Sequence, residues 1–402
     1  MVTVQYNPFI PDVHANPYPM YARLRAEDPI HWSPLMEAWV LTRYDDVAAV
    51  LTDSRFSADR RQARNRFADE IAKREEEFGP FGRTRTMLTS DPPEHTRLRR
   101  LVSKAFTPRM VEGLRPRIQA IVDELLDEAA QNGRMDVIRD LAYPLPVIVI
   151  AEMLGVPPEH RDQFKHWSDE IVGVLGGPLV PQETLERSRA AVHELAGYLQ
   201  GVIAERRREP REDLVSGLIA AEEQGQILSE DEMLATAMLL LVAGNETTTN
   251  LIGNGMLGLL RNPDQMDKLR ADPSLVATAV EELLRYDGPV QATGRVAMEE
   301  LEIGGQRVTP GQAVLTVLGA ANRDPAQFER PDELDLDRQP NEHVAFGDGI
   351  HFCLGAPLAR AEGQIAFETL LRRFAHPRLE TDSLQWGGSF ILRGLKSLPI
   401  AF

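Results

Sequence analysis

Cysteine and long apolar runs are nearly absent from this sequence. Cys353 is the only cysteine in 402 residues, so the chain can form no intramolecular disulfide and no zinc or iron–sulfur centre held by several thiolates. A long chain with one thiol is typical of a reducing compartment. No apolar run reaches the ~18 residues of a membrane-spanning helix, and the first residues lack the features of a secretory signal. We therefore expect a cytoplasmic protein.

Positive charge is scarce as well. The chain has 44 Lys and Arg against 61 Asp and Glu, which gives a net charge of −17. This balance argues against binding to nucleic acid or to an anionic membrane surface. No repeat, linker or low-complexity tract divides the chain, so we expect a single domain over residues 1–402.

Apolar periodicity predicts a mainly α-helical fold with a small β region. Helices are expected at residues 17–27, 44–51, 67–77, 110–131, 141–154, 159–175, 183–208, 229–260, 274–286 and 357–374. Another helix is expected to open at Asp91, with that residue as its N-cap. Strands are expected at residues 30–32, 39–42, 135–137, 294–297, 307–309 and 313–317.

Cys353 lies in a glycine-rich loop, Phe346-Gly347-Asp348-Gly349-Ile350-His351-Phe352-Cys353-Leu354-Gly355. Glycine permits left-handed backbone and close approach to a ligand. Such a loop, running into a helix, can offer backbone N–H groups to a thiolate. The competing interpretation is a buried, inert cysteine in a turn, which is the usual case for a lone thiol.

A second motif lies at His95 and Arg99, which share one face of the expected helix because they are four residues apart. Cationic side chains placed together can bind carboxylates, although a solvated surface pair is the commoner case. Between His95 and Arg109 no acidic residue occurs, which predicts a local basic patch on an acidic protein; its members are Arg97, Arg100, Lys104 and Arg109.

The longest periodic stretch, residues 229–260, opens with a capping-box pattern at Ser229 and Glu232. At ~1.5 Å per residue this helix would be roughly 48 Å long. Its middle reads Ala243-Gly244-Asn245-Glu246-Thr247-Thr248-Thr249, which is locally unfavourable in a buried helix. Violations of this kind cluster at functional sites, and the competing interpretation is a kink with a capped acid.

In order and spacing, these motifs resemble those of the cytochrome P450 family, and the resemblance covers essentially the whole chain. It implies a P450-like fold whose long central helix crosses over a haem b, with Cys353 as the axial thiolate of the iron. Further haem contacts are then expected from His95, Arg99, Arg295, His351, Phe346, Gly347, Ala243 and Gly244. Glu246 and Thr247 would relay protons to dioxygen. Asn245 departs from the family pattern, where many bacterial members carry His.

The resemblance also assigns a structural group and a substrate pocket. Glu282 and Arg285 match the buried Glu-x-x-Arg of the family, which is locked to a further arginine, here Arg338. Residues 57–90 match the loop that covers the substrate, and the Gly176-Gly177-Pro178 break matches the hinge of a lid. The pocket is expected to be lined by Met87, Leu88, Leu239, Ala243, Val290, Gln291, Ala292, Phe390 and Ile391.

The implied activity is that of a bacterial haem-thiolate monooxygenase, which inserts one oxygen atom from O2 into a lipophilic small molecule by hydroxylation or epoxidation. Electrons would come from a separate ferredoxin or flavodoxin-type carrier and its NAD(P)H reductase, docking near Arg97, Arg100, Lys104 and Arg109. We expect a monomer with no fused reductase. The alternatives are a peroxide-driven peroxygenase, a haem-based isomerase or dehydratase, and a non-catalytic haem sensor.

Overall fold

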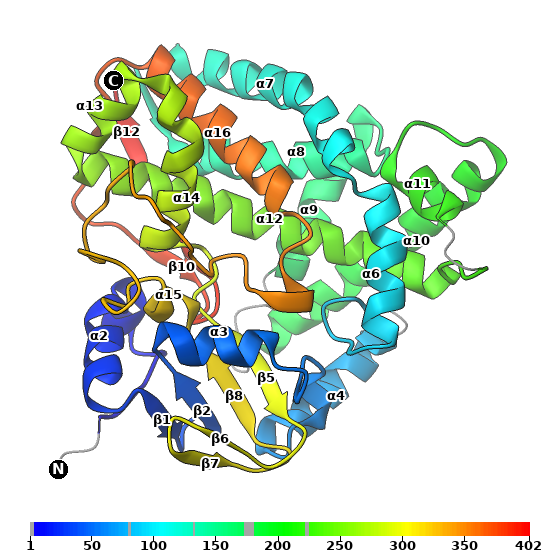
Figure 1. Ribbon diagram of the computed structural model, residues 1–402. Helices are drawn as coiled ribbons and strands as arrows, with labels where there is room; N and C mark the ends of the chain where they lie inside the picture. The colour runs from blue at the N-terminus through cyan, green and yellow to red at the C-terminus, as the bar shows by residue number, and fades with distance from the viewer. Residues whose placement is uncertain (1–3, 79–81, 132, 173–180, 222–224) are drawn as a thin grey trace.

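The computed structural model describes residues 4–78, 82–131, 133–172, 181–221 and 225–402. A helical body forms most of the molecule, and a smaller β region with the N-terminal helices lies at one side of it (Figure 1). Its larger helices are α6 (Glu94–Ala105), α7 (Pro108–Ala130), α8 (Pro144–Met153), α9 (Arg161–Val172), α10 (Gln182–Arg208), α12 (Glu230–Arg261), α14 (Val276–Asp287) and α16 (Ala356–Arg373). One large cluster of buried apolar side chains joins them.

The main sheet has five strands in the order β1-β2-β8-β5-β3. Most neighbours are antiparallel, but β2 and β8 run parallel, with Val40 opposite Leu315. The sheet is therefore assembled from strands far apart in the sequence, and its strands are β1 (Ile30–Ser33), β2 (Ala38–Leu41), β3 (Phe56–Ser57), β5 (Thr293–Ala297) and β8 (Ala313–Thr316).

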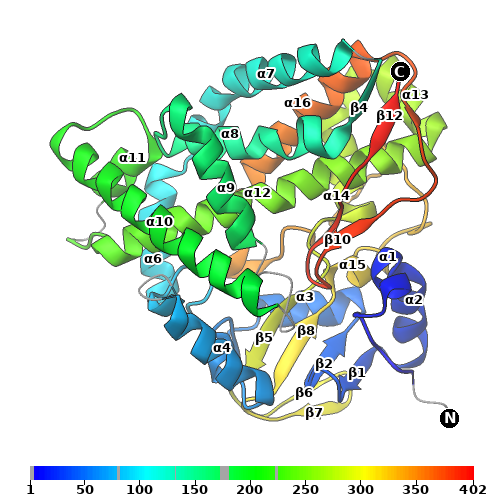
Figure 2. The same cartoon turned by 180° about the vertical axis from the view of Figure 1, so that it is seen from behind.

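The remaining elements lie within, between and beside these two parts, and the view from behind shows α1 and α2 next to the sheet (Figure 2). The helices are α1 (Pro11–Ala15), α2 (Tyr18–Glu27), α3 (Tyr44–Thr52), α4 (Arg66–Glu77), α11 (Leu214–Ala220), α13 (Pro263–Ala271) and α15 (Leu318–Ala321). The strands are β4 (Arg134–Asp136), β6 (Leu301–Ile303), β7 (Gln306–Val308), β9 (Arg378–Leu379), β10 (Trp386–Gly388), β11 (Arg393–Leu395) and β12 (Pro399–Ala401).

Helix α12 runs through the middle of the helical body (Figure 1). Its first turn has the predicted capping box, in which the Ser229 hydroxyl accepts from the Glu232 N–H and the Glu232 carboxylate accepts from the Ser229 N–H. Glycine allows close packing farther along, since a Cβ at Gly255 would lie 2.5 Å from Phe367 of α16. The prediction of a long buried helix is confirmed.

The mainly helical character and the small sheet near the N-terminus are also as predicted. One detail is wrong: Asp91 does not cap α6, because that helix begins at Glu94 and its Pro93 N-cap provides no side-chain bond. The Asp91 carboxylate instead accepts from the Ser57 hydroxyl and from the Ala58 N–H. The expected helix at residues 141–154 is divided, since a π-helical turn at Ile138–Ala142 precedes α8.

Two further expectations concern segments rather than single residues. The Gly176-Gly177-Pro178 break lies outside the described residues. Within the described part of the chain, no helix is long and apolar enough to cross a membrane.

Candidate active site

The loop before α16 holds Cys353 in a fixed backbone frame. The Cys353 N–H donates to the Phe346 carbonyl at 3.0 Å, and the Asp348 carboxylate accepts from the Gly349 N–H at 2.6 Å. Gly347 and Gly349 have φ values of 71° and 65°, and a Cβ at Gly349 would lie 2.9 Å from the Leu51 carbonyl oxygen. Glycine is therefore required at Gly349 for both its backbone angle and its close approach to α3.

The surroundings of the Cys353 sulfur suit a metal-bound thiolate. The N–H groups of Gly355 and Ala356 point at the sulfur and, with Arg99 and Arg360, they favour the anion, but burial outweighs them and raises the pKa of the thiol. The side chain nevertheless keeps accessible surface. A cation bound at that sulfur would deprotonate it outright.

Arg360 of α16 supports this loop, and the sequence motifs did not point to it. Its guanidinium lies 4.7 Å from the centre of the Phe346 ring and pairs with Glu281 through bonds of 2.7 and 2.7 Å. The Glu281 carboxylate also meets Nε2 of His343 at 3.1 Å. Nδ1 of that histidine accepts the Ala345 N–H, so Nε2 carries the proton that Glu281 accepts. Together these contacts hold a positive charge beside the thiol.

The predicted haem contacts His95, Arg99, Arg295 and His351 do come together in space. The rings of His95 and His351 have centroids 4.3 Å apart. His95 is 3% exposed, yet neither of its ring nitrogens has a hydrogen-bond partner in the described structure. Arg99 reaches the loop itself, donating to the Phe352 carbonyl at 2.8 Å.

The positively charged forms of these side chains repel one another. Burial, and then His95, Arg295 and Arg99, lower the pKa of His351 to about 4, against a smaller opposite effect of Asp91. Burial and Arg60 lower the pKa of Arg295 to about 10. Converging cations and unpaired imidazole nitrogens form a site for an anion, and its composition fits the two carboxylates of haem.

The middle of α12 differs from the rest of that helix. Ala243 is exposed, and Gly244, Glu246 and Thr247 are partly so, although most of the helix is buried. The Thr247 hydroxyl donates to the Ala243 carbonyl at 2.7 Å, as expected for a threonine bonded to the preceding turn. Among the described residues, this part of α12 is therefore only partly covered by other protein groups.

The Glu246 carboxyl keeps its proton to a higher pH than an exposed glutamate does. Its Oε2 is buried without a hydrogen-bond partner in the described structure, and burial raises the pKa of the carboxyl to about 7. Asn245 points elsewhere: its Nδ2 donates to the Ser168 hydroxyl of α9 at 2.7 Å. Asn245, the residue that departs from the family pattern, thus connects α12 to α9.

Glu282, Arg285 and Arg338 form a buried ionic group, as predicted. Arg285 donates to both carboxylate oxygens of Glu282 at 2.7 and 2.8 Å, and Arg338 Nε donates to them at 3.1 and 3.1 Å. The arginines also donate to main-chain carbonyls, including that of Asn322. The group therefore ties α14 to the irregular segment that precedes the Cys353 loop.

We expect Glu282→Gln to destabilise the protein by about 3–5 kcal/mol, because it leaves two buried guanidinium groups without their counter-ion. Chemical denaturation with the haem-loaded protein measures this. Arg307→Ala is the matched control: its pair with Glu300 is 72% and 56% exposed and should contribute less than about 1 kcal/mol. Equal effects of the two substitutions would contradict the structural role.

The predicted pocket residues differ in how far they are buried. Met87 and Ala292 are buried, and Leu239 and Val290 pack at the edge of the core, whereas Leu88 is 54% exposed. Ile391 accepts the Gln291 N–H through its carbonyl at 2.7 Å.

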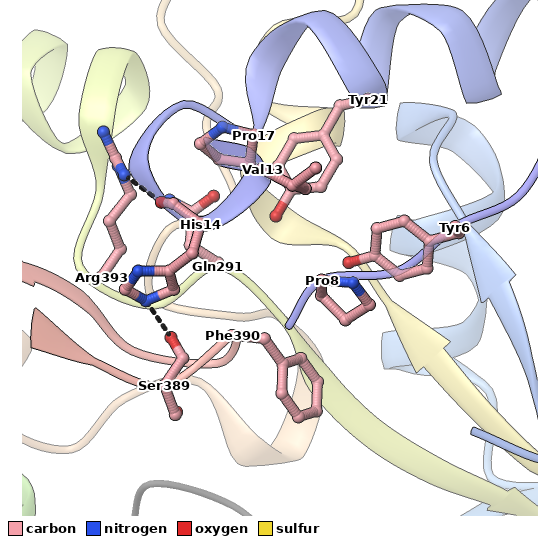
Figure 3. Close-up of a pocket in the computed structure, with 10 residues that line it drawn as sticks. All are labelled: Tyr6, Pro8, Val13, His14, Pro17, Tyr21, Gln291, Ser389, Phe390 and Arg393. Atoms are coloured by element: carbon pink, nitrogen blue, oxygen red, sulfur yellow. Dashed lines mark hydrogen bonds between the residues drawn. The ribbon is translucent and has the colours of Figure 1, made fainter. Parts of the chain in front are cut away.

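Gln291 and Phe390 line a small pocket beside the N-terminal segment (Figure 3). In it His14 meets the Ser389 carbonyl at 3.3 Å. The Gln291 side chain is buried and donates to the Gly288 carbonyl at 2.8 Å. Its amide nitrogen therefore has a structural partner, whereas its side-chain carbonyl oxygen is buried without a hydrogen-bond partner among the described residues.

The basic patch is smaller than the sequence indicated. Arg97 forms ion pairs with Glu94 and with Glu232 of α12, so its charge is neutralised. Arg100, Lys104 and Arg109 are exposed.

Comparison with known proteins decides the family. The family model described as cytochrome P450 matches residues 31–385. This chain belongs to the cytochrome P450 family. It is 47% identical to the cytochrome P450 CYP107DY1 of Priestia megaterium over 91% of this chain and 90% of that protein, and 45% identical to the cytochrome P450 monooxygenase PikC of Streptomyces venezuelae over 97% and 92%.

Solved structures agree with this assignment. The P450 PksS of the Bacillus subtilis bacillaene polyketide synthase matches with a TM-score of 0.91 at 42% identity, covering 99% of both chains. CalO2 matches with a TM-score of 0.91 at 36% identity, covering 100% of this chain and 99% of that one. The predicted fold and family are thereby confirmed, and the protein is a P450 monooxygenase. The family implies a haem with a cysteine thiolate, and the loop and the cation cluster fit that group.

Proposed function

We propose that this P450 inserts one oxygen atom from O2 into a lipophilic small molecule, using electrons from a separate carrier. The observation that carries the proposal is Glu246: a buried carboxyl with a pKa of about 7, next to Thr247 on an accessible stretch of α12. An enzyme that reduces and splits dioxygen needs a proton source at its site. A haem sensor would need no such relay, and an isomerase or dehydratase would not need external electrons. Peroxygenases of this fold typically lack the acid–threonine pair, so its presence here counts against that alternative.

Haem, when bound, would supply the iron centre at which dioxygen is activated, with electron density pushed from the Cys353 thiolate. The residues of the chain do the rest. His95, Arg99, Arg295 and His351 would hold the haem carboxylates, and the N–H groups of Gly355 and Ala356 would keep the sulfur in place.

Glu246 would hold a proton at its carboxyl group near neutral pH. The protonated carboxyl would donate a hydrogen bond to the Thr247 hydroxyl, and that hydroxyl would donate its own hydrogen bond onward. For this the hydroxyl must leave the Ala243 carbonyl, a rotation about one side-chain bond. The apolar walls expected at Met87, Leu239 and Val290 would exclude water and favour a lipophilic substrate. The relatives support this substrate class: one is named vitamin D(3) 25-hydroxylase and another 6-deoxyerythronolide B hydroxylase.

The carbon-monoxide difference spectrum of the reduced protein tests the proposal. The expected result is the red-shifted Soret band of a thiolate-ligated haem, followed by product formation that depends on O2 and on a surrogate ferredoxin system. A wild-type protein that never shows this band, or one that turns over only with hydrogen peroxide, would overturn the proposal.

We propose that the electron carrier docks at Arg100, Lys104 and Arg109, without Arg97. The double substitution Arg100→Glu and Arg109→Glu should raise the KM for an acidic ferredoxin by about three- to tenfold at low salt, and by less as salt screens the charges. Steady-state reduction at two ionic strengths measures this. Arg307→Glu adds the same kind of charge change on the β6–β7 hairpin and should leave the KM unchanged. An equal change in both variants would place the carrier elsewhere.

A further inference from the structure

Arg60 lies beside the cation cluster, although no sequence motif indicated it. It opens a short 3-10 turn, Arg60–Gln62, just after β3. Strand β3 pairs with β5, with Ser57 opposite Val296, which is the residue after Arg295. Asp91 fixes the same segment by accepting from the Ala58 N–H at 2.9 Å. The pairing therefore brings Arg60 to the edge of the site where Arg295 lies.

The neighbouring arginines are neutralised, but Arg60 is not. Arg61 pairs with Asp59 at 2.8 Å, and Arg85 reaches the same carboxylate at 3.2 Å. Among the described residues, the Arg60 side chain has no hydrogen bond and no ion pair; Glu75 is the acid that acts on it electrostatically, from beyond ion-pair distance. The side chain keeps accessible surface although burial lowers the pKa of its guanidinium.

Arg60 adds a further positive charge to a cluster that contains little negative charge. It is the largest electrostatic influence on Arg295, and the imidazole nitrogens of His95 nearby have no partner in the part of the chain that the structure describes. Asp91 is the acid that opposes these charges, and it already accepts from Ser57 and Ala58. A cluster with more cations than anions, and with unpaired donors, needs a ligand of opposite charge.

We propose that Arg60 is a further ligand of the haem carboxylates, and that it holds the segment after β3, the start of the expected substrate-covering loop, at the edge of the cofactor. The inference rests on the proposed haem site. In this arrangement Arg60 and Arg295 approach the carboxylates from the β3–β5 side, and His95 and Arg99 approach from α6. The cofactor then connects two parts of the chain that are far apart in the sequence.

The test compares Arg60→Met with Arg61→Met, because methionine keeps the apolar part of either side chain. Transfer of haem to apomyoglobin should be on the order of tenfold faster for Arg60→Met than for wild type, as expected from the loss of one hydrogen bond to a charged group. The Arg61 variant should match wild type, since Arg85 still pairs with Asp59. Resonance Raman bands of the haem carboxylates should shift only in the Arg60 variant.

The outcomes separate the two proposals. If wild-type protein binds haem with a thiolate spectrum but Arg60→Met loses haem at the wild-type rate with unchanged carboxylate bands, the Arg60 assignment is wrong and the haem site stands. If Arg60→Met changes only the affinity for carboxylate-bearing substrates, Arg60 is a substrate ligand and our inference is overturned. If wild type itself shows no thiolate spectrum, the proposed function fails first.

Discussion

Cys353→His should abolish the red-shifted Soret band of the reduced carbon-monoxide complex while leaving the protein folded. Imidazole cannot supply the negative charge of the thiolate, and the N–H groups of Gly355 and Ala356 favour an anion at that place. Monooxygenase turnover should fall by more than about a hundredfold, since losing even residues that only support a metal ligand costs about 10–100-fold.

The control for this prediction is Ile350→Val in the same loop, whose side chain is 53% exposed. It should keep both the band and the turnover. Circular dichroism and thermal unfolding of both variants establish that the fold is intact. If Cys353→His kept the thiolate band, another group would have to ligate the iron, and Cys353 is the only cysteine of the chain.

Glu246→Gln should lower product formation by about 10²–10³-fold, because it removes the proton source while keeping the shape of the side chain. Oxygen and electron consumption should continue, with peroxide released in place of product. Thr247→Ala should have the same effect, and Thr247→Ser, which keeps the hydroxyl, should restore part of the activity. Product per electron consumed is the measurement.

The pH dependence gives an independent check of Glu246. The pKa is raised to about 7 by burial, so the protonated, proton-donating form is present below about pH 7 and is lost above it. Coupled turnover of wild type should therefore fall as pH rises through about 7, whereas Glu246→Gln should show no such step. Folding stability should also fall as pH rises between about 4.5 and 7. In that range the folded state keeps the Glu246 proton, whereas the unfolded state, with the ordinary pKa of 4.5, has released it. Identical pH profiles for the two proteins would contradict the assignment.

Local pattern was sufficient to predict most of the helices and the motifs. The capping box at Ser229 and the apolar run after it predict α12, because both act within a few turns of one helix. The Asp91 cap could not be judged in the same way. Its carboxylate accepts hydrogen bonds from Ser57 and Ala58. These partners lie more than thirty positions away, so a local sequence pattern cannot indicate them.

The candidate active site also combines residues that local motifs indicate with residues that only long-range contacts bring together. The thiol loop, the acid and threonine on α12, and the pair His95 and Arg99 each lie within a short stretch of the chain. Local motifs therefore locate them, and the family resemblance implies their chemistry. Arg60 and Arg360 have no such spacing. Arg60 becomes part of the site through the pairing of β3 with β5, and Arg360 through Glu281 of another helix.

The sequence by itself therefore determined the family and located the thiol and the proposed proton-donating pair, because these motifs depend on short-range order in the chain. Only the tertiary structure decided which charges are available. It neutralises Arg97 and Arg61 with acids from nearby turns and another helix. Among the residues that the structure describes, it leaves the side chains of His95 and Arg60 without a partner beside Arg295. The physical reason is that the strength of a charge depends on burial and on its neighbours in space, which a linear pattern does not specify.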